Sequence, residues 1–459
     1  MFGISSKMTK PASSGDGIET LSPSAVPFAR EISACRICGN ADLISVFDLG
    51  PMALTGVFPS SRREDPARLP LDLVKCCDRG RPDACGLVQL RHSFDLPLLF
   101  GNHYGYRSGL NAWMISHLAA IASDLRQRLP LSSPDIVLDI GSNDGTLLGA
   151  FLSTGAALVG MDPVGQKFAR FYPPEAQLID DFFSAARFLS ATGGQRARLV
   201  TSVAMVYDLE RPCEFASQVR DVLADDGIWF FEQSCLPAML ANTSYDTICH
   251  EHLEYYTLKQ IHWMLRGAGF QIAAISFNAA NGGSFAVVAT PAGGPHAVNS
   301  SAVQEALRLE EEQDPGGLVA LAAFRESSLR RRDELRGALH AAARRGARVL
   351  GYGASTKGNV ILQFCGLTAA DLLCIAEVNP DKYGCFTPGS AIPIVSELEA
   401  RNLRPDSFLV LPWHFRDTII AREAAFLAQG GCLLFPLPQF HLHRAEAPCL
   451  EGGSVACPG

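Results

Sequence analysis

One short polar segment of the chain is dense in side chains that can transfer protons. It runs Tyr245-Asp-Thr-Ile-Cys-His-Glu-His-Leu-Glu-Tyr-Tyr256 and places His250, Glu251 and His252 in succession. A histidine near its ordinary pKa can accept a proton at neutral pH, and a neighbouring carboxylate can orient or tune it. The two histidines lack the H-E-x-x-H spacing that holds zinc on one helix face. They stand two apart, as on one face of a strand, so a metal site remains the weaker alternative to acid–base chemistry.

A second segment has the spacing of a nucleotide-type turn. Val137-Leu-Asp-Ile-Gly-Ser-Asn-Asp-Gly-Thr146 predicts a buried strand over 136–140, a tight turn and a helix from Thr146. Ligands of open α/β sheets bind at the carboxyl ends of strands, and glycine lets a ligand approach the backbone closely. The spacing Asp-x-Gly-x-Asn-x-Gly is typical of S-adenosylmethionine (SAM) sites and lacks the full G-x-G-x-x-G of dinucleotide sites. An acidic residue one βα unit later, Asp162, is suited to ribose hydroxyls. We therefore predict a SAM site made of Asp139, Gly141, Asn143, Asp144, Gly145 and Asp162.

Four cysteines near the N-terminus have the character of a structural zinc site. Cys35 and Cys38 form a C-x-x-C followed by glycine, and Cys76 and Cys85 come later, the last also followed by glycine. Four thiolates can close a tetrahedral site, and metal would supply much of the folding energy of a segment with little core. We expect no large core over 35–92, because Pro, Gly and Arg interrupt its apolar runs. The spacing of the second pair is wide, and Cys77 is an alternative to Cys76 as ligand.

The last third of the chain opens with a second glycine-rich turn. Arg348-Val-Leu-Gly-Tyr-Gly-Ala-Ser-Thr-Lys-Gly358 predicts a strand, a turn and a helix start, where backbone N–H groups can bind phosphate. Gly353, Ser355 and Lys357 are therefore candidate ligands of a diphosphate. The alternative is a plain βα turn with a solvated lysine. Asn281-Gly-Gly-Ser284 is a strong hairpin signal, and its Asn281, Gly283 and Ser284 are candidates for pocket contact.

The elements that position these groups follow from apolar periodicity. A helical pattern between 100 and 129 has its apolar stripe at Trp113, Ile115, Leu118, Ile121 and Leu125. The expected strands are Ile136–Ile140, Ala157–Met161, Leu199–Val203, Gly227–Phe231 and Phe285–Val288. Two helices follow at 301–312 and 318–345, and the second is an amphipathic connector. Its expected apolar contacts are Leu318, Leu321, Phe324, Leu329 and Leu335.

Composition limits the class of protein. A chain of 459 residues is expected to form two or three domains. The net charge of −8 without a basic run argues against a nucleic-acid or anionic-membrane surface, and no apolar run is long enough to span a membrane. Fourteen cysteines in a chain whose start lacks the apolar core of a signal peptide predict reduced thiols in a cytoplasmic protein.

Taken together and in order, these motifs resemble one family: the sugar C-methyltransferases that add a methyl branch to nucleotide-linked 4-keto-6-deoxy sugars. The resemblance extends from Cys35 to about Pro438. The matching pieces are Cys35-x-x-Cys38-Gly, Cys85-Gly-Leu-Val-Gln-Leu90, Tyr106-Arg-Ser108, Asp139–Gly145, His250-Glu-His-x-Glu-Tyr-Tyr256, Asn281–Ser284, Gly351–Gly358 and Pro388-Gly.

The resemblance implies an α/β fold in consecutive parts and two cofactors, SAM and zinc. We expect a tail at 1–30, a zinc-binding module at 31–95, a Rossmann-like class I methyltransferase domain at 96–295, a helical connector at 296–345, a Rossmann-like sugar-nucleotide domain at 346–445 and a loose tail at 446–459. The substrate would be a nucleotide-diphosphate 4-keto-6-deoxy sugar held between the domains.

The resemblance also implies catalytic roles. His252 corresponds to the general base, with Glu251 beside it, and Tyr106 to a hydroxyl near the sugar. Tyr207 stands where well-known members have a histidine, and Cys249 where they have a tyrosine. A base alone is insufficient for a weak carbon acid, so Tyr106 or Tyr207 would hydrogen-bond the enolate oxygen. The two departures leave the exact sugar open.

Two other functions compete with this prediction. The first is a nucleotide-sugar oxidoreductase using NAD in the Gly351 turn, helped by Glu377 but lacking the third glycine, since Thr356 stands there. The second is a catalytically inactive sugar-nucleotide-binding protein, which the intact H-E-H-x-E-Y-Y segment disfavours. The sequence leaves open the nucleotide base, the carbon methylated and the oligomeric state.

Overall fold

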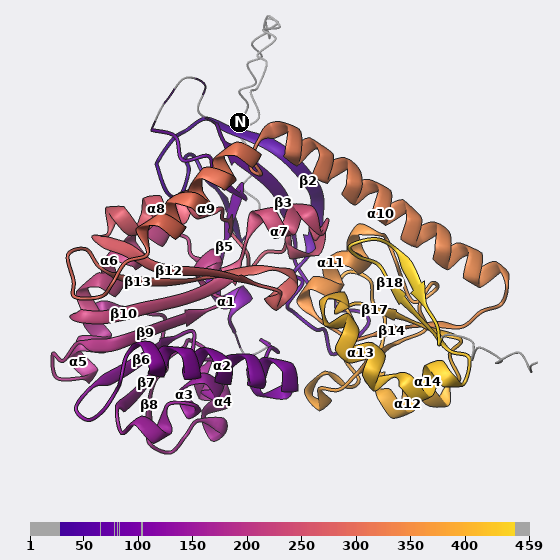
Figure 1. Ribbon diagram of the computed structural model, residues 1–459. Helices are drawn as coiled ribbons and strands as arrows, with labels where there is room; N and C mark the ends of the chain where they lie inside the picture. The colour runs from indigo at the N-terminus through magenta and orange to yellow at the C-terminus, as the bar shows by residue number, and fades with distance from the viewer. Residues whose placement is uncertain are drawn as a thin grey trace, which may run out of the picture.

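The computed structural model describes residues 28–64, 66–77, 79, 81, 83–101 and 104–445. Most of the predicted tail at 1–30, and all of the tail predicted at 446–459, lie outside these residues. Figure 1 shows two α/β lobes side by side, with a smaller N-terminal module above the gap between them. The predicted α/β fold class is confirmed.

The first lobe is built on a seven-stranded sheet in the order β12-β13-β10-β9-β6-β7-β8. Its central strands are mutually parallel, and β13 pairs antiparallel with both β10 and β12. The bounds are β6 (Ile136–Ile140), β7 (Ala157–Met161), β8 (Ala176–Ile179), β9 (Ala197–Val203), β10 (Leu223–Ser234), β12 (Phe270–Asn278) and β13 (Ser284–Pro291). The chain runs outward from β6 to β8 and then returns to the other side of β6. The carboxyl end of β6 is therefore a topological switch point, where open sheets bind ligands. Strands β8 and β12 were not predicted.

Helices cover both faces of this sheet: α2 (Ala112–Arg128), α3 (Thr146–Gly149), α4 (Gly165–Phe168), α5 (Ala185–Ala191), α6 (Pro212–Val222), α7 (Leu236–Ala241) and α8 (Leu258–Gly267). In α2 the predicted apolar stripe is partly wrong. Leu118, Ile121 and Leu125 are buried, but Met114 joins them while Ile115 is exposed. Met114 lies within the stripe formed by Leu118, Ile121 and Leu125, whereas Ile115 is about 100° further around the helix, at the edge of that stripe, and is exposed to solvent.

The N-terminal module contains a four-stranded antiparallel sheet in the order β11-β4-β3-β2. Its strands are β2 (Leu43–Ala53), β3 (Arg68–Cys76), β4 (Val88–Leu90) and β11 (Glu254–Tyr255), and a separate pair joins β1 (Ala29–Glu31) to β5 (His92–Phe94), followed by α1 (Leu96–Leu99). Strand β11 belongs to the polar segment of the first lobe. The end of the segment with proton-transfer groups therefore forms an edge strand of the module.

The prediction that residues 35–92 form no large core is wrong. Leu69, Leu71 and Leu73 alternate along β3 and are all buried, within a core shared with the second lobe and the connector. The interrupting Pro and charged residues occupy the alternate positions, which face outward in a strand. The apolar face of β3 is buried by the second lobe and the connector, so the sequence of residues 35–92 alone could not reveal this burial.

The connector consists of α9 (Ser300–Gln313) and α10 (Leu318–Arg344), within a residue or two of the predicted bounds. Helix α10 extends from beside the module along the outer edge of the second lobe (Figure 1). Leu321, Phe324 and Leu335 are buried as predicted. Leu318 is exposed, because it begins the helix before the helix meets its neighbours, and Leu329 is only half-buried.

The second lobe is a separate α/β unit, as predicted from its glycine-rich turn. Its sheet has the order β16-β15-β14-β17-β18-β19, parallel except for β19. The strands are β14 (Val349–Tyr352), β15 (Ile375–Glu377), β16 (Ile394–Ser396), β17 (Ser407–Val410), β18 (Cys432–Phe435) and β19 (His441–His443), and the helices are α11 (Thr356–Phe364), α12 (Glu397–Asn402), α13 (Arg416–Arg422) and α14 (Ala424–Ala428). Within the described ranges, no helix combines the length and apolarity needed to cross a membrane.

Candidate active site

The predicted SAM turn follows β6 directly. Gly141, Asn143 and Gly145 have φ angles of 74°, 52° and 74°, a region that glycine adopts freely and that asparagine tolerates better than most residues. Asp139 is buried within β6 and accepts a hydrogen bond from Thr201 Oγ1 at 2.6 Å. Burial raises the pKa of Asp139 to about 7. The turn therefore has the backbone form that its sequence predicts.

Asp162 lies at the end of β7, beside this turn. One carboxylate oxygen accepts a hydrogen bond from the backbone N–H of Asn143 and the other from that of Val164, both at 2.8 Å. Burial raises the pKa of Asp162 to about 6. The carboxylate thus holds the turn after β6 through two backbone hydrogen bonds.

Residues Tyr104–Leu110, which we call the strap, cross the SAM turn. Asn143 Oδ1 and Asp144 Oδ2 each accept a hydrogen bond at 2.9 Å, from the backbone N–H groups of Ser108 and Gly109 respectively. Asn143 Nδ2 also donates to the Tyr106 carbonyl oxygen at 3.2 Å. A Cβ at Gly109 would stand 2.7 Å from Asp144 Oδ2, so the close approach requires glycine. The side chains of the turn therefore hold the strap in place.

The polar segment is a tight turn, not the extended stretch that its sequence suggested. The backbone N–H of His252 bonds to the Cys249 carbonyl at 3.1 Å, and β11 begins two residues later. His250 is fully buried, with Nε2 3.2 Å from the Leu69 carbonyl oxygen and its ring against Phe94. The turn thus sends the two histidines into different surroundings, and His250 is a hydrogen-bonded core residue.

His252 has the geometry of a proton acceptor. Its Nδ1 lies 2.9 Å from the Thr247 carbonyl oxygen. Because a carbonyl can only accept, Nδ1 bears the hydrogen and Nε2 carries a lone pair. The ring packs edge-on against Tyr207, with centroids 4.4 Å apart. Burial and the charge of Lys357 lower the pKa of His252 to about 3, so the imidazole is neutral at physiological pH.

Glu251 lies between the module and the second lobe. A Cβ at Gly56 would collide with its Oε1, and Thr356 Oγ1 lies near the same point. Burial raises the pKa of Glu251 to about 7. Among the described residues, no hydrogen bond or neighbouring charge offsets this effect of burial on the pKa of Glu251. Glu251 can therefore change its protonation state near neutral pH.

Lys357 joins the second lobe to the hairpin between β12 and β13. Its Nζ donates to the carbonyl oxygen of Asn281 at 2.9 Å, and its charge acts on His252 and His414. Asn281 and Gly283 have φ angles of 53° and 123°, in the hairpin turn that the sequence predicts, and Ser284 is buried at the start of β13. Asn281, Lys357 and His252 therefore belong to one neighbourhood.

The N–H groups of the second glycine-rich turn are used inside the protein. Ala354 donates to Glu377 Oε2 at 2.7 Å, and Gly358 donates to Ser355 Oγ at 3.0 Å. Gly353 has a φ of 82° and donates to the Ala376 carbonyl oxygen. Glu377 Oε1 accepts two further backbone N–H groups. The carboxylate that the NAD hypothesis assigned to ribose is thus fully engaged.

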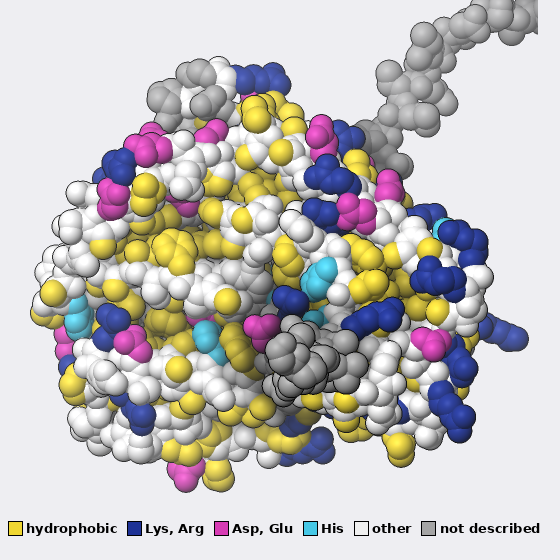
Figure 2. All heavy atoms as spheres, turned by 45° about the vertical axis from the view of Figure 1, so that its right-hand side comes forward, with side chains coloured by type: hydrophobic (Ala, Val, Ile, Leu, Met, Phe, Trp, Pro, Cys, Tyr) yellow, Lys and Arg dark blue, Asp and Glu magenta, His cyan; other side chains and the backbone are white. Residues whose placement is uncertain are grey.

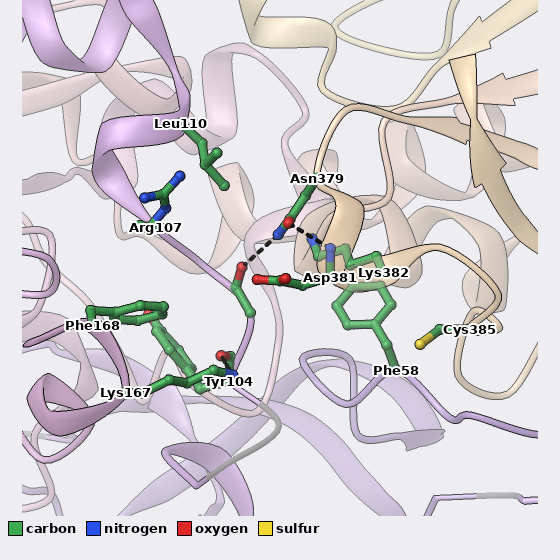
Figure 3. Close-up of a pocket in the computed structure, with 11 residues that line it drawn as sticks. Phe58, Tyr104, Arg107, Leu110, Lys167, Phe168, Asn379, Asp381, Lys382 and Cys385 are labelled. Atoms are coloured by element: carbon green, nitrogen blue, oxygen red, sulfur yellow. Dashed lines mark hydrogen bonds between the residues drawn. The ribbon is translucent and has the colours of Figure 1, made fainter. Parts of the chain in front are cut away.

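A cleft of about 160 Å³ separates the strap and α4 from the loop after β15 (Figure 3). Three cations line it: Arg107 and Lys167 from the first lobe and Lys382 from the second. Asn379 Nδ2 spans the cleft to the Gly105 carbonyl oxygen at 3.5 Å. Tyr104 also lines it, and the charge of Glu251 contributes to raising the pKa of Tyr104. The cleft therefore adjoins the polar segment.

Figure 2 shows basic and histidine side chains among apolar ones near the middle of the face where the lobes meet. Sequence reasoning missed Tyr104, Gly109 and His414 in this region, and it gave no role to Ser108 and Glu254, although both lie within the matched motifs. Tyr104 could have been found from the sequence, because it stands two residues before Tyr106, which the motif match identified. Nothing near His414 in the sequence points to the polar segment.

The four predicted zinc ligands converge. The Sγ atoms of Cys35, Cys38, Cys76 and Cys85 all lie within 4.8 Å of one another, with 3.5 Å between Cys35 and Cys85 and 3.6 Å between Cys38 and Cys76. Four thiolates at 2.3 Å from a tetrahedral ion stand about 3.8 Å apart, so the set fits zinc. Cys77 lies outside the cluster. The structure therefore favours Cys76 over Cys77.

Comparison with known proteins gives the same three parts. Family models match a zinc binding domain at residues 35–100, a methyltransferase domain at 114–275 and a C-methyltransferase C-terminal domain at 279–438. The curated C-methyltransferase NovU of Streptomyces niveus is 32% identical over 423 residues, covering 91% of this chain and 98% of NovU.

Solved methyltransferases also match part of the chain. CcbJ of Streptomyces caelestis is 14% identical, with a TM-score of 0.31 over 38% of this chain and 90% of CcbJ. The glycopeptide N-methyltransferase MtfA, solved with SAM, is 14% identical, with a TM-score of 0.29 over 38% of this chain and 93% of MtfA. The family models and the NovU match, with the turn after β6 and the four-cysteine cluster, establish that the chain is a SAM-dependent, zinc-binding member of the C-methyltransferase family.

Proposed function

We propose that the protein transfers a methyl group from SAM to a carbon beside the ketone of a nucleotide-linked 4-keto-6-deoxy sugar. The observation that carries this proposal is the neutral His252, whose Nδ1 is held by the Thr247 carbonyl group and whose ring packs against Tyr207 in the field of Lys357. A neutral base and a nearby cation are what enolate formation requires. The full-length match to a C-methyltransferase supports carbon as the atom methylated.

In this mechanism His252 Nε2 removes the proton from the carbon next to the ketone, and the C–H electron pair forms the enolate. Tyr106 or Tyr207 donates a hydrogen bond to the enolate oxygen. When bound, SAM would supply an electrophilic methyl group to the enolate carbon, its S–CH3 bond breaking and S-adenosylhomocysteine leaving, while Tyr106 or Tyr207 would release the oxygen as the ketone re-forms. The chain's remaining task is to align the carbon and the methyl group, which can contribute about 7–11 kcal/mol to the barrier reduction in favourable cases.

The electrostatics of the site suit a base that acts only on bound substrate. Without bound substrate, the protonated form of His252 is disfavoured, because burial and the charge of Lys357 lower its pKa to about 3. An enolate beside the ring supplies the missing negative charge, and two opposite charges attract strongly in a buried site. Glu251, whose pKa burial raises to about 7, can then accept the proton from His252 or help to hold its charge.

We assign the two ligands to the two sides of the strap. SAM binds the turn formed by Asp139, Gly141, Asn143, Asp144 and Gly145, with Asp162 toward its ribose. The sugar lies near Tyr106, Lys357 and the Asn281–Ser284 hairpin, including Gly283. The diphosphate extends toward the cleft cations Arg107, Lys167 and Lys382, because the N–H groups of the Gly353–Ser355 turn are largely engaged. Cys35, Cys38, Cys76 and Cys85 hold a structural zinc ion.

The test is methyl transfer from isotope-labelled SAM to a panel of nucleotide-linked 4-keto-6-deoxy sugars, with the product carbon located by NMR. We expect label on a carbon adjacent to the ketone. Label on oxygen, or turnover of NAD without methyl transfer, would overturn the proposal. In the same assay, the Lys357→Met variant should show a lower rate of methyl transfer than wild type, because the substitution removes the cation beside the enolate.

A further inference from the structure

The zinc cluster and the proposed base are connected through one buried arginine. Arg36 stands between zinc ligands Cys35 and Cys38, so its backbone is fixed from both sides. Its side chain is only 3% exposed. A buried guanidinium must satisfy its donors within the protein, and Arg36 does this at the edge of the module sheet.

The guanidinium of Arg36 contacts two consecutive strands, β4 and β5. One guanidinium nitrogen donates to the Leu90 carbonyl oxygen at 2.7 Å and to Gln89 Oε1 at 3.2 Å. The other donates to the His92 carbonyl oxygen and to Ser93 Oγ, both at 3.0 Å. The planar fork of arginine thus joins the end of β4 to the start of β5 through two contacts with each strand, which a lysine could not reproduce.

The remaining nitrogen faces the polar segment. Arg36 Nε lies 3.6 Å from Oε1 of Glu254, whose side chain is fully buried. Within the described structure, neither carboxylate oxygen of Glu254 has a hydrogen-bond partner. Burial raises the pKa of Glu254, and the positive charge of Arg36 opposes that rise, so Arg36 is the charged group that faces this carboxyl group in the interior.

Glu254 begins β11, and β11 sets the surroundings of His252. Glu254 pairs with Gln89 in the ladder between β11 and β4, and the Leu90 N–H donates to the Leu253 carbonyl oxygen at 2.8 Å. Tyr255, the next residue, donates through its hydroxyl to the Thr247 carbonyl oxygen at 3.2 Å. The same carbonyl accepts the Nδ1 hydrogen of His252. A shift of β11 would therefore move the group that fixes the tautomer and the orientation of the ring.

We propose that Arg36 is a positioning residue that sets the orientation of His252 through Glu254, β11 and the Thr247 carbonyl group. The zinc site then acts on the base indirectly, because it fixes the backbone from which Arg36 extends. This inference rests on the proposed role of His252. A displacement of about 1 Å in a catalytic group can cost about 10²-fold in rate.

The test compares variants that retain zinc. Arg36→Met alone would leave the Glu254 carboxylate buried without a counter-charge, so we pair it with the neutral substitution Glu254→Gln. The matched control is Arg79→Met, since the Arg79 side chain is 71% exposed in the same module and pairs with Asp42. Each purified variant is assayed for zinc content, SAM affinity by calorimetry, methyl-transfer kcat and amide hydrogen exchange over residues 247–256.

We expect the double variant to keep its zinc and to bind SAM within about twofold of wild type, but to lose about 10- to 100-fold in kcat. Exchange over 247–256 should rise in the double variant and stay unchanged in Arg79→Met. Arg36→Lys should give an intermediate kcat, because it keeps the charge without the fork. Wild-type kcat in the double variant, or an equal loss of kcat and SAM affinity, would overturn the inference.

The exchange measurement separates this inference from the proposed function. It reports the order of the segment whether or not His252 is the base. If His252→Ala retains activity while the double variant raises exchange over 247–256, the proposed function fails and the link from Arg36 to the segment stands. If exchange is unchanged in the double variant, the link itself is refuted.

Discussion

Gly109→Ala is the substitution that most directly tests whether the strap holds the SAM turn in its binding form. A Cβ at this position would stand 2.7 Å from Asp144 Oδ2 and 3.1 Å from Thr146 Oγ1. The Gly109 N–H also donates to the same Asp144 oxygen at 2.9 Å, so relieving the clash would lengthen this hydrogen bond. Overpacking costs about 1–3 kcal/mol, and a hydrogen bond to a charged group contributes about 1.5–3 kcal/mol. The alanine variant must therefore distort the strap or leave it undocked.

If SAM binds only when the strap is docked, a cost of about 1–3 kcal/mol appears as a 5- to 150-fold loss of affinity. Isothermal titration calorimetry of the folded variant measures this loss. The matched control is Gly149→Ala in α3, where the nearest neighbour of the new Cβ is Pro173 Cγ at an ordinary 3.8 Å. That control should bind SAM as wild type does. A folded Gly109→Ala protein with wild-type affinity would refute the role of the strap.

Three further predictions concern the cofactors and Glu251. Cys38→Ser should lose bound zinc while Cys77→Ser retains it, as elemental analysis can show; equal zinc in both would exclude Cys38 as a ligand. Asp162→Asn should weaken SAM binding about tenfold in calorimetry, the effect of losing one hydrogen bond to a charged group, and unchanged affinity would remove Asp162 from the site. Burial raises the pKa of Glu251 from 4.5 to about 7. The contribution of Glu251 to the free energy of unfolding is therefore complete below pH 4.5, and it is lost as the pH rises through 7. As the pH rises from 5 to 8, the free energy of unfolding of Glu251→Gln in urea should therefore gain about 1–3 kcal/mol relative to wild type, after allowance for partial exposure. Parallel profiles of unfolding free energy against pH for the two proteins would contradict this.

The sequence predicted the parts of the fold that local patterns determine. The strands at 136–140 and 157–161 were placed to the residue, because each is a short apolar run bounded by turn residues. Both glycine-rich turns and the Asn281 hairpin were placed correctly, since positive φ angles leave a clear signature in glycine and asparagine. The four cysteines could be assigned to one metal site from the sequence, because metal ligands recur at characteristic spacings, and their sulfur atoms do converge in the structure.

The remaining features depend on contacts between distant segments. Strand β11 is two residues long and pairs with β4, about 160 residues away in the chain, so no local pattern marks it. The burial of Leu69 and Leu71 depends on the second lobe and α10. Lys357 was predicted as a phosphate ligand from its place at a helix start, but its bond to the Asn281 carbonyl oxygen depends on how the lobes meet. Tertiary packing, which the sequence encodes only indirectly, determined each of these.

The most direct test of the central claim is the exchange of the substrate's ring hydrogen in deuterated water, with S-adenosylhomocysteine in place of SAM so that no methyl transfer follows. Wild-type protein and His250→Ala should exchange the hydrogen next to the ketone, because His250 is a core residue bonded to Leu69. His252→Ala should bind both ligands yet lose exchange by about 10²-fold or more. Near-wild-type exchange in His252→Ala, together with its loss in Tyr106→Phe or Glu251→Gln, would show that another residue is the base.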